Sequence, residues 1–229
     1  MSTVILRKLC KTFGEDALAV HALRDIDLEI DSGDFVCISG PSGSGKTTLL
    51  NMIGGLDRPT SGQITVANQR VDQMDKSALA DLRLHNIGFI FQAYNLIPVL
   101  TARENVEFVM QLQGIRSDVR HKKSAEILHE TGLDGMENRK PAELSGGQQQ
   151  RVAVARALVS EPALILADEP TANLDSVTAG NLMGLLRHLN DDRDITFVIS
   201  THDKMVMGHA HRLLGMHDGQ IVNDTQQRQ

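Results

Sequence analysis

The sequence lacks a run of apolar residues long enough to cross a membrane. Its longest apolar stretches have about the length of a strand, whereas a membrane span needs roughly 20 such residues. It also lacks a charged amino-terminal region followed by an apolar core, so no signal peptide is expected. If the protein acts at a membrane, we expect another chain to supply the span.

Cysteine is scarce, and basic residues do not dominate. Cys10 and Cys37 lie in apolar, strand-like surroundings at no metal-ligand spacing, so we interpret them as reduced, buried thiols. Lysine and arginine number 23 against 29 acidic residues, a net charge of −6. This balance argues against nucleic acid as the partner. His209, His211 and His217 have no cysteine or acid at a convincing ligand spacing, so we predict no metal site there.

The stretch from 40 to 48 has the pattern of a phosphate-binding loop. A glycine is followed by four residues and then Gly-Lys-Thr, between an apolar strand-like run and an apolar helical stripe. Glycines let backbone N–H groups approach phosphates closely, and the helix start adds further donors. We expect Lys46 to reach the β and γ phosphates and Thr47 to ligate Mg²⁺. The candidate nucleotide-binding residues here are Gly40, Pro41, Ser42, Gly43, Ser44, Gly45, Lys46, Thr47 and Thr48.

An acidic pair follows a later apolar run. Residues 163–167 predict a buried strand that delivers Asp168 and Glu169 at its carboxyl end. Ligands of parallel sheets bind at that edge. We expect Asp168 to serve Mg²⁺ and Glu169 to polarise the attacking water.

Two other strands end in polar side chains. Gln92 follows the predicted strand 87–91, and His202 follows the predicted strand 195–200. A glutamine in such a place can reach a metal or a water, although by itself it is more often structural. A histidine at the same sheet edge is where a γ-phosphate contact would be needed, and the company of Lys46 and Asp168 favours that function.

A second glycine-containing helix start lies at 144–150. The Ser145 hydroxyl and the first N–H groups of the following helix form another anion site. One triphosphate does not need two such sites from one chain. We therefore predict a dimer, in which this helix start addresses the ATP bound to the partner's phosphate-binding loop.

The rest of the chain predicts one domain with a helical insertion. Residues 1–34 have the pattern of antiparallel strands, and 93–156 change to helical periodicity between two strand-rich halves. Phe13 could stack on a base, but alone it is more often an ordinary packed side chain. Asp218-Gly219 predicts a closing hairpin, and the polar segment 225–229 is expected to fray.

Together these motifs resemble the ATP-binding cassette (ABC) ATPases across nearly the whole chain. Gln92 matches the Q-loop, 144–148 the signature, 163–169 the Walker B strand, 173–175 the D-loop and His202 the switch histidine. The resemblance implies an α/β fold: a P-loop NTPase (RecA-like) core with an amino-terminal antiparallel β subdomain and an inserted α-helical subdomain. The implied division is a core of 1–92 and 157–229 and a helical signature subdomain of 93–156, in one domain of 1–229.

The resemblance also implies residue roles. Phe13 would stack on adenine, which reverses the preference for ordinary packing. Thr47, Gln92 and Asp168 would hold Mg²⁺, and the catalytic residues would be Lys46, Gln92, Glu169 and His202. Ser145, Gly146, Gly147 and Gln148 would bind ATP from the partner copy, with Asp175 contributed by the D-loop.

A finer resemblance is to the lipoprotein-release and macrolide-export (LolD/MacB-like) subfamily. It is carried by 55–62, by 87–92 with 95–98, by 100–102 with 104–106, and by 167–171 with 173–175. Ala172 stands where that subfamily usually has glycine. The resemblance implies a homodimer that powers a membrane permease with a periplasmic domain, from the cytoplasmic face of the bacterial inner membrane. We expect Ala93–Leu100 to help line a groove for the permease, and packing inside the helical block is the alternative.

Two other function classes fit the sequence less well. A soluble, non-transport ABC ATPase that regulates another machine, such as the ribosome or DNA repair, usually has two cassettes or a long coiled-coil insertion, and this chain has neither. A metabolic P-loop kinase leaves 144–150 unexplained.

Overall fold

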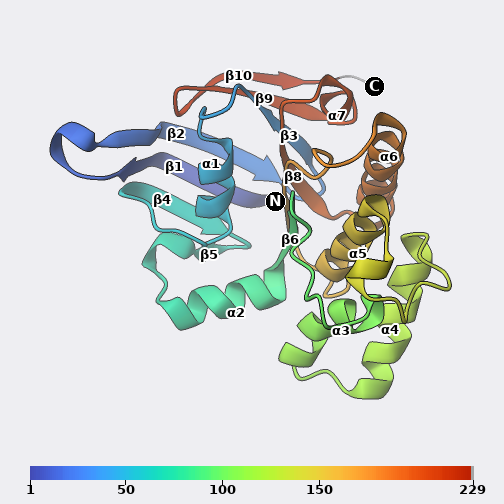
Figure 1. Ribbon diagram of the computed structural model, residues 1–229. Helices are drawn as coiled ribbons and strands as arrows, with labels where there is room; N and C mark the ends of the chain where they lie inside the picture. The colour runs from blue at the N-terminus through green and yellow to red at the C-terminus, as the bar shows by residue number, and fades with distance from the viewer. Residues whose placement is uncertain (228–229) are drawn as a thin grey trace.

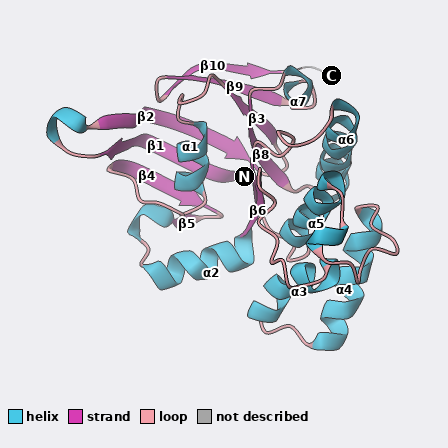
Figure 2. Ribbon diagram, viewed as in Figure 1, coloured by secondary structure: helices cyan, strands magenta, loops and turns pink. Residues whose placement is uncertain are grey.

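The computed structural model describes residues 1–227 and contains two β-sheets with helices around them (Figures 1 and 2). The larger sheet has six strands in the order β10-β9-β3-β8-β7-β6. Its strands are β3 (Phe35–Ser39), β6 (Ile87–Phe91), β7 (Leu164–Asp168), β8 (Thr196–Thr201), β9 (Arg212–His217) and β10 (Gln220–Gln226). Strands β3, β6, β7, β8 and β9 run parallel, and β10 returns antiparallel to β9. The carboxyl ends of these five parallel strands therefore lie at the same edge of the sheet.

The smaller sheet is antiparallel, as the amino-terminal pattern predicts. Its order is β2-β1-β4-β5, with β1 (Ser2–Phe13), β2 (Val20–Asp31), β4 (Ser61–Val66) and β5 (Gln69–Arg70). In β2 the apolar residues Ile26, Leu28 and Ile30 are buried while the acidic residues between them are exposed. This alternation packs one face of the sheet on the core and leaves the other in water.

Helix α1 (Lys46–Ile53) lies between the two sheets (Figure 1). Its buried side chains form one apolar cluster with residues of both sheets, including Val36 and Ile38 of β3. The alternate residues of β3, Phe35 and Cys37, belong to a second cluster on the opposite face. The central strands are thus buried on both faces, which explains their nearly continuous apolar sequences.

Helices belong to this second cluster. Helix α5 (Gly146–Leu158) contacts β6, α6 (Ser176–Arg193) lies beside α5, and α3 (Ala102–Leu112) and α4 (Ser117–Glu130) pack on α5. Helix α2 (Lys76–Asn86) lies below the small sheet in Figure 1, and α7 (Lys204–Met207) is short. Single 3₁₀ turns occur at η1 (Asp16–Leu18), η2 (Val71–Gln73) and η3 (Pro141–Glu143). None of the helices in 1–227 is both long and apolar enough to span a membrane.

Capping residues set the starts of the helical block. Thr101 and Glu104 form a complete capping box at α3, with the Thr-x-x-Glu spacing typical of such boxes. Ser145 and Gln148 form another at α5. Helix α5 continues to Leu158, so the proposed subdomain boundary at 156/157 falls inside a helix.

The expectation for the carboxyl-terminal tail was wrong in part. Strand β10 continues through Thr225 and Gln226, because its backbone pairs with β9 although its side chains are polar and exposed. Residues 228–229 lie outside the described part of the chain.

Candidate active site

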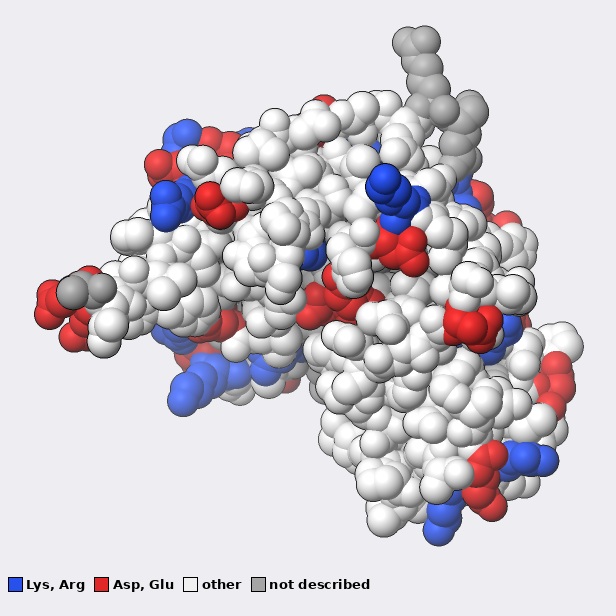
Figure 3. Space-filling view, turned by 45° about the horizontal axis from the view of Figure 1, so that its top comes forward, with Lys and Arg blue, Asp and Glu red and all other residues white. Residues whose placement is uncertain are grey.

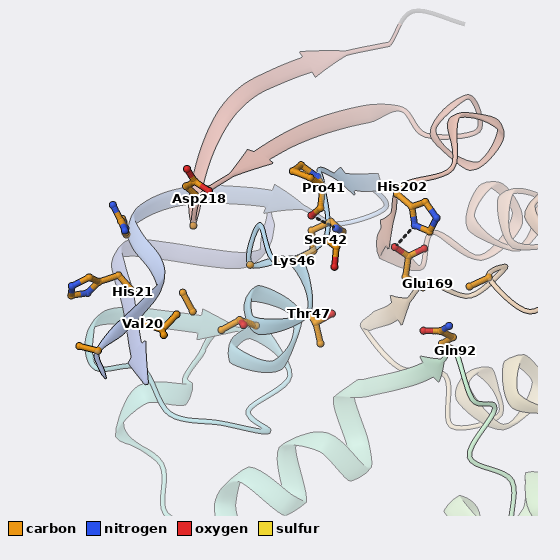
Figure 4. Close-up of a pocket in the computed structure, with 18 residues that line it drawn as sticks. Val20, His21, Pro41, Ser42, Lys46, Thr47, Gln92, Glu169, His202 and Asp218 are labelled. Atoms are coloured by element: carbon orange, nitrogen blue, oxygen red, sulfur yellow. Dashed lines mark hydrogen bonds and ion pairs between the residues drawn. The ribbon is translucent and has the colours of Figure 1, made fainter. Parts of the chain in front are cut away.

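A cavity of about 940 Å³ opens at the carboxyl edge of the larger sheet (Figure 4). Its walls come from the start of β2, the loop before α1 and the ends of the parallel strands. The predicted residues that line it are Pro41, Ser42, Gly43, Gly45, Lys46, Thr47, Thr48, Gln92, Glu169 and His202. Residues far apart in sequence therefore meet around one space large enough for a nucleotide, since ligand pockets generally measure ~300–1,000 Å³.

The loop between β3 and α1 needs glycine at two positions. Gly45 caps α1 with a left-handed φ of 103°, and a Cβ there would stand 2.6 Å from the Ala22 carbonyl oxygen. Gly40 has a φ of 156°, and a Cβ there would stand 2.3 Å from the Met216 carbonyl oxygen. The loop is thus pressed between β2 and β9 so closely that only backbone fits, and it turns the first N–H groups of α1 to the cavity side.

Lys46 is held under this loop without an acidic partner. Its side chain is 8% exposed and Nζ donates to the carbonyl oxygens of Gly40 at 2.8 Å and Pro41 at 3.0 Å. Within residues 1–227 no carboxylate forms an ion pair with it. The ammonium charge is therefore available to an anion in the cavity.

An oxygen-rich cluster lies beside Lys46. The Thr47 hydroxyl donates to Asp168 Oδ1 at 3.1 Å, and the Ser200 hydroxyl donates to the same oxygen. Mg²⁺ prefers oxygen ligands such as hydroxyl and carboxylate groups. In phosphate sites it is held by one or two protein ligands together with oxygens of the substrate. The pair fits that ion, and in 1–227 no larger His, Cys, Asp or Glu cluster could hold a metal by itself.

Glu169 and His202 point toward one another at the far wall of the cavity (Figure 4). Their Oε1 and Nδ1 atoms are 2.8 Å apart. Glu169 has a left-handed φ of 46°, and its N–H donates to the Ser200 carbonyl oxygen at 3.1 Å. Such a conformation is rare for a glutamate and is typical of functional sites, because the surroundings must fix it.

The negative charge of Glu169 also affects the sheet below it. Burial, with a smaller contribution from Glu169, raises the pKa of the Cys37 thiol to about 12. Cys37 therefore stays a neutral thiol at physiological pH, and it is free and buried, as the sequence predicts for it.

Gln92 follows β6 and lies on the cavity wall. Its carbonyl oxygen accepts a hydrogen bond from Asn173 Nδ2 at 2.9 Å. The Q-loop and D-loop segments named from the resemblance are thus in direct contact.

Other predicted residues lie outside the cavity. Ser145 and Gln148 cap α5, and with Gly146 and Gly147 they do not contribute to the cavity wall in this chain. Asp175 caps α6 by accepting hydrogen bonds from Val177 and Thr178, and the bond from the Thr178 hydroxyl is the main cause that lowers the pKa of this carboxyl.

Phe13 stands at the rim rather than in the wall. It pairs across the small sheet with Val20, which lines the cavity. Its ring is 44% exposed, and Lys11 Nζ lies 4.7 Å from the ring centroid. The side chain is thus accessible next to the cavity, and its stacking on a base stays a prediction.

Sequence reasoning missed the second side of the cavity. Val20, His21, Arg24, Asp218 and Gly219 also line it. The Gly219 N–H donates to the Ser44 carbonyl oxygen at 3.0 Å, and the Gly219 carbonyl oxygen accepts from the Arg24 N–H at 2.8 Å. The Asp218-Gly219 pair signals the hairpin turn, but no local signal places that turn against a loop so distant in sequence.

Comparison with known proteins agrees with this geometry. The ABC transporter family model matches residues 23–172. The chain is 45% identical over 226 residues to the macrolide export ATP-binding/permease protein MacB of Mannheimia succiniciproducens. The match covers 99% of this chain but 35% of that protein, so the chain spans about a third of the length of such relatives. It is also 44% identical to the uncharacterized ABC transporter ATP-binding protein MJ0796 of Methanocaldococcus jannaschii, and the match covers 97% of each chain.

Solved structures show the same likeness. A dimeric, post-hydrolysis structure of the MJ0796 cassette bound to ADP and Pi superposes with a TM-score of 0.91 at 42% identity, covering 99% of both chains. The cbiO1 subunit of Clostridium perfringens, part of the cbiONQ transporter complex, gives a TM-score of 0.88 at 29% identity over 98% of this chain and 88% of that one. The chain belongs to the ABC transporter family and is one of its ATP-binding ATPase cassettes.

Proposed function

We propose that this chain binds ATP·Mg²⁺ in the cavity and hydrolyses it to ADP and phosphate. The observation that carries the proposal is the meeting of Lys46, the Thr47–Asp168 pair and the Glu169–His202 pair around one cavity. The amides of 40–48 and Lys46 hold the phosphates, and Phe13 and Val20 flank the base. Thr47, Asp168 and Gln92 hold Mg²⁺, which when bound neutralises charge on the phosphates.

Glu169 acts as the general base in this proposal. It accepts the proton of the attacking water, and His202 orients Glu169 and contacts the γ-phosphate. The 2.8 Å contact between their side chains supports this division of roles, because a base must be oriented by a neighbour. No oxidant or further co-substrate is needed, since water is the nucleophile.

We further propose that the active form is a dimer. Ser145, Gly146, Gly147 and Gln148 form a capped helix start with free N–H groups that does not reach this chain's own cavity. In a two-fold dimer this helix start faces the partner's ATP, and Asp175 lies nearby. The dimeric MJ0796 cassette, at 42% identity, supports the arrangement.

A membrane permease is the proposed partner, in a complex of the lipoprotein-release or macrolide-export type at the cytoplasmic face of the inner membrane. A second cavity, of about 370 Å³, supports it. This groove is mostly apolar and lies between α2, β6, α3 and α5, with Phe89 and Phe91 stacked at 5.7 Å on its floor. We name it the α2–α5 groove.

The segment Ala93–Leu100 contributes to this groove through Asn95. Leu96 packs against the core instead, and Asn105 binds the backbone of Ile97 and Leu100. The division into a core of 1–92 with 157–229 and a helical part of 93–156 likewise remains part of this proposal.

A regulator of nucleic-acid machinery is the second candidate and is less well supported. On the face of the described chain that Figure 3 shows, basic and acidic side chains are interspersed in small groups. A strong phosphate-backbone binder would instead need a continuous basic surface.

The test is steady-state ATP hydrolysis by the purified chain and its Glu169→Gln variant, with nucleotide binding measured in parallel. We expect Glu169→Gln to bind ATP as the unaltered chain does, to lose turnover and to accumulate as a dimer. Hydrolysis by Glu169→Gln at near the unaltered rate would exclude Glu169 as the base.

A further inference from the structure

Tyr94 and Asn95 form a strained turn directly after Gln92. Their φ angles are 60° and 50°, so two consecutive residues with side chains adopt the left-handed conformation. Each such residue costs roughly 1 kcal/mol or more, and it persists only where the surroundings fix it.

Arg156 of α5 supplies the restraint. Its guanidinium donates through Nη2 to the Tyr94 carbonyl oxygen at 2.9 Å and through Nη1 to the Asn95 carbonyl oxygen at 2.5 Å. Burial lowers the pKa of Arg156 below its ordinary value, yet a guanidinium stays protonated in proteins. A planar fork can hold two successive carbonyl groups at once, and a lysine ammonium cannot match that geometry.

The turn at Tyr94 and Asn95 lies close to the nucleotide cavity, the α2–α5 groove and the start of helix α5. The Tyr94 hydroxyl oxygen lies 3.0 Å from the position a Cβ on Gly146 would take, at the start of the signature helix α5. Gln92, two residues before Tyr94, lines the nucleotide cavity. Asn95 and Arg156 both line the α2–α5 groove. One strained turn thus lies between the cavity, the groove and the helix start proposed to act on the partner's ATP.

We propose that Arg156 is a positioning residue that ties the turn after Gln92 to the signature helix, so that occupancy of the groove and occupancy of the nucleotide cavity affect each other through it. Arg156 does not line the nucleotide cavity and so does not contact the reacting atoms. The inference rests on the proposed function, because it assigns regulation to that same site.

The chain contains its own reporter for the test. Tyr94 is its only tyrosine and tryptophan is absent, so the intrinsic tyrosine emission comes from this turn alone. The experiment measures the Tyr94 fluorescence lifetime and its quenching by iodide, with and without a non-hydrolysable ATP analogue and Mg²⁺. Lifetimes are used because adenine absorption distorts intensities. kcat and KM for ATP are measured on the same proteins.

We expect the unaltered chain to change its Tyr94 lifetime on nucleotide binding. In Arg156→Gln that change should disappear, and kcat should fall on the order of 10-fold while KM stays within about twofold, because the phosphate-binding loop is untouched. Arg156→Lys, which keeps one hydrogen bond, should give intermediate values. This milder variant also keeps the proposal testable if Arg156→Gln does not fold.

Arg151→Gln is the matched control. Arg151 lies on the same helix and also donates to a backbone carbonyl, that of Thr131 at 2.9 Å, but away from the turn. Arg151→Gln should show the same lifetime change of Tyr94 on nucleotide binding, and the same kcat and KM for ATP, as the unaltered chain. The same loss in Arg151→Gln, or an unaltered response and kcat in Arg156→Gln, would overturn the proposal.

The groove is tested by filling it. Ala80 lies on its wall, and Ala80→Phe adds bulk there without reaching the nucleotide cavity. We expect Ala80→Phe to shift the Tyr94 lifetime in the chain that keeps Arg156, and to cause no shift when it is combined with Arg156→Gln. Equal shifts in both backgrounds would contradict the link. If the unaltered chain showed no hydrolysis, the proposed function would fail, but the lifetimes without nucleotide would still test the restraint by Arg156.

Discussion

Replacing Lys46 by alanine is the most quantitative test of the phosphate site. Lys46 is buried, and within residues 1–227 its ammonium donates to carbonyl oxygens and forms no ion pair that would offset its attraction to a bound anion. Two unit charges 4 Å apart interact by about 4 kcal/mol at an effective dielectric constant of 20. The hydrogen bonds to Gly40 and Pro41 are exchanged for similar bonds to phosphate, so the charge term decides the difference.

An energy of about 4 kcal/mol corresponds to roughly 1,000-fold in affinity, and partial screening by salt lowers this toward 100-fold. We therefore expect Lys46→Ala to weaken ATP binding by between about 100-fold and 1,000-fold in titration calorimetry at fixed salt. Lys122→Ala is the control, because Lys122 is an exposed lysine of α4 far in sequence from the cavity. Binding by Lys46→Ala within about threefold of the unaltered chain would refute this reading of the site.

Three further outcomes concern stability and reactivity. The hydrogen bond from Arg70 lowers the pKa of Asp72 below its usual 3.8, so the ionised carboxylate stabilises the fold above pH 3.8 and this stabilisation is lost as the pH falls through the lowered pKa. Asp72→Asn should therefore lower the urea midpoint at pH 7. The difference in midpoint between the variant and the unaltered chain should narrow below pH ~4. Asn105→Ala should cost about 1–3 kcal/mol of unfolding free energy, because Asn105 is fully buried and its Oδ1 accepts the hydrogen bond of the partly buried Ile97 N–H at 2.7 Å. An unchanged urea midpoint would contradict this. With its pKa raised to about 12, Cys37 should resist iodoacetamide at pH 8 in the folded chain and react once urea unfolds it, with mass spectrometry of the labelled peptides as the measurement.

Sequence reasoning succeeded where function depends on local pattern. The buried strands, the glycines at 40 and 45 and the capping residues Thr101 and Ser145 each carry a signal within a few positions, because strand periodicity and backbone conformation are local properties. The shared sheet edge of Gln92, Asp168 and His202 followed from the parallel arrangement alone.

What the sequence did not predict depends on contacts between distant segments. The Asp218-Gly219 turn lies against the phosphate-binding loop because β9 pairs with β3, a register with no local signal. The stretch 93–100 was expected to help line a permease groove because it is apolar. Asn95 lines the α2–α5 groove, whereas Leu96 packs against the core and Asn105 binds the backbone of Ile97. Apolar residues after a strand end fit either a groove or a core, and tertiary packing decides between them.

We expect each ATP to be hydrolysed between the cavity of one copy and the signature helix of another. Ser145→Arg blocks the helix start and leaves Glu169 intact, whereas Glu169→Gln removes the base and leaves the helix start intact. Each variant alone should be inactive. An equal mixture should recover up to about a quarter of the unaltered ATPase rate, because half of the dimers are mixed and each mixed dimer has one complete site out of two. A mixture as inactive as its two components would contradict it.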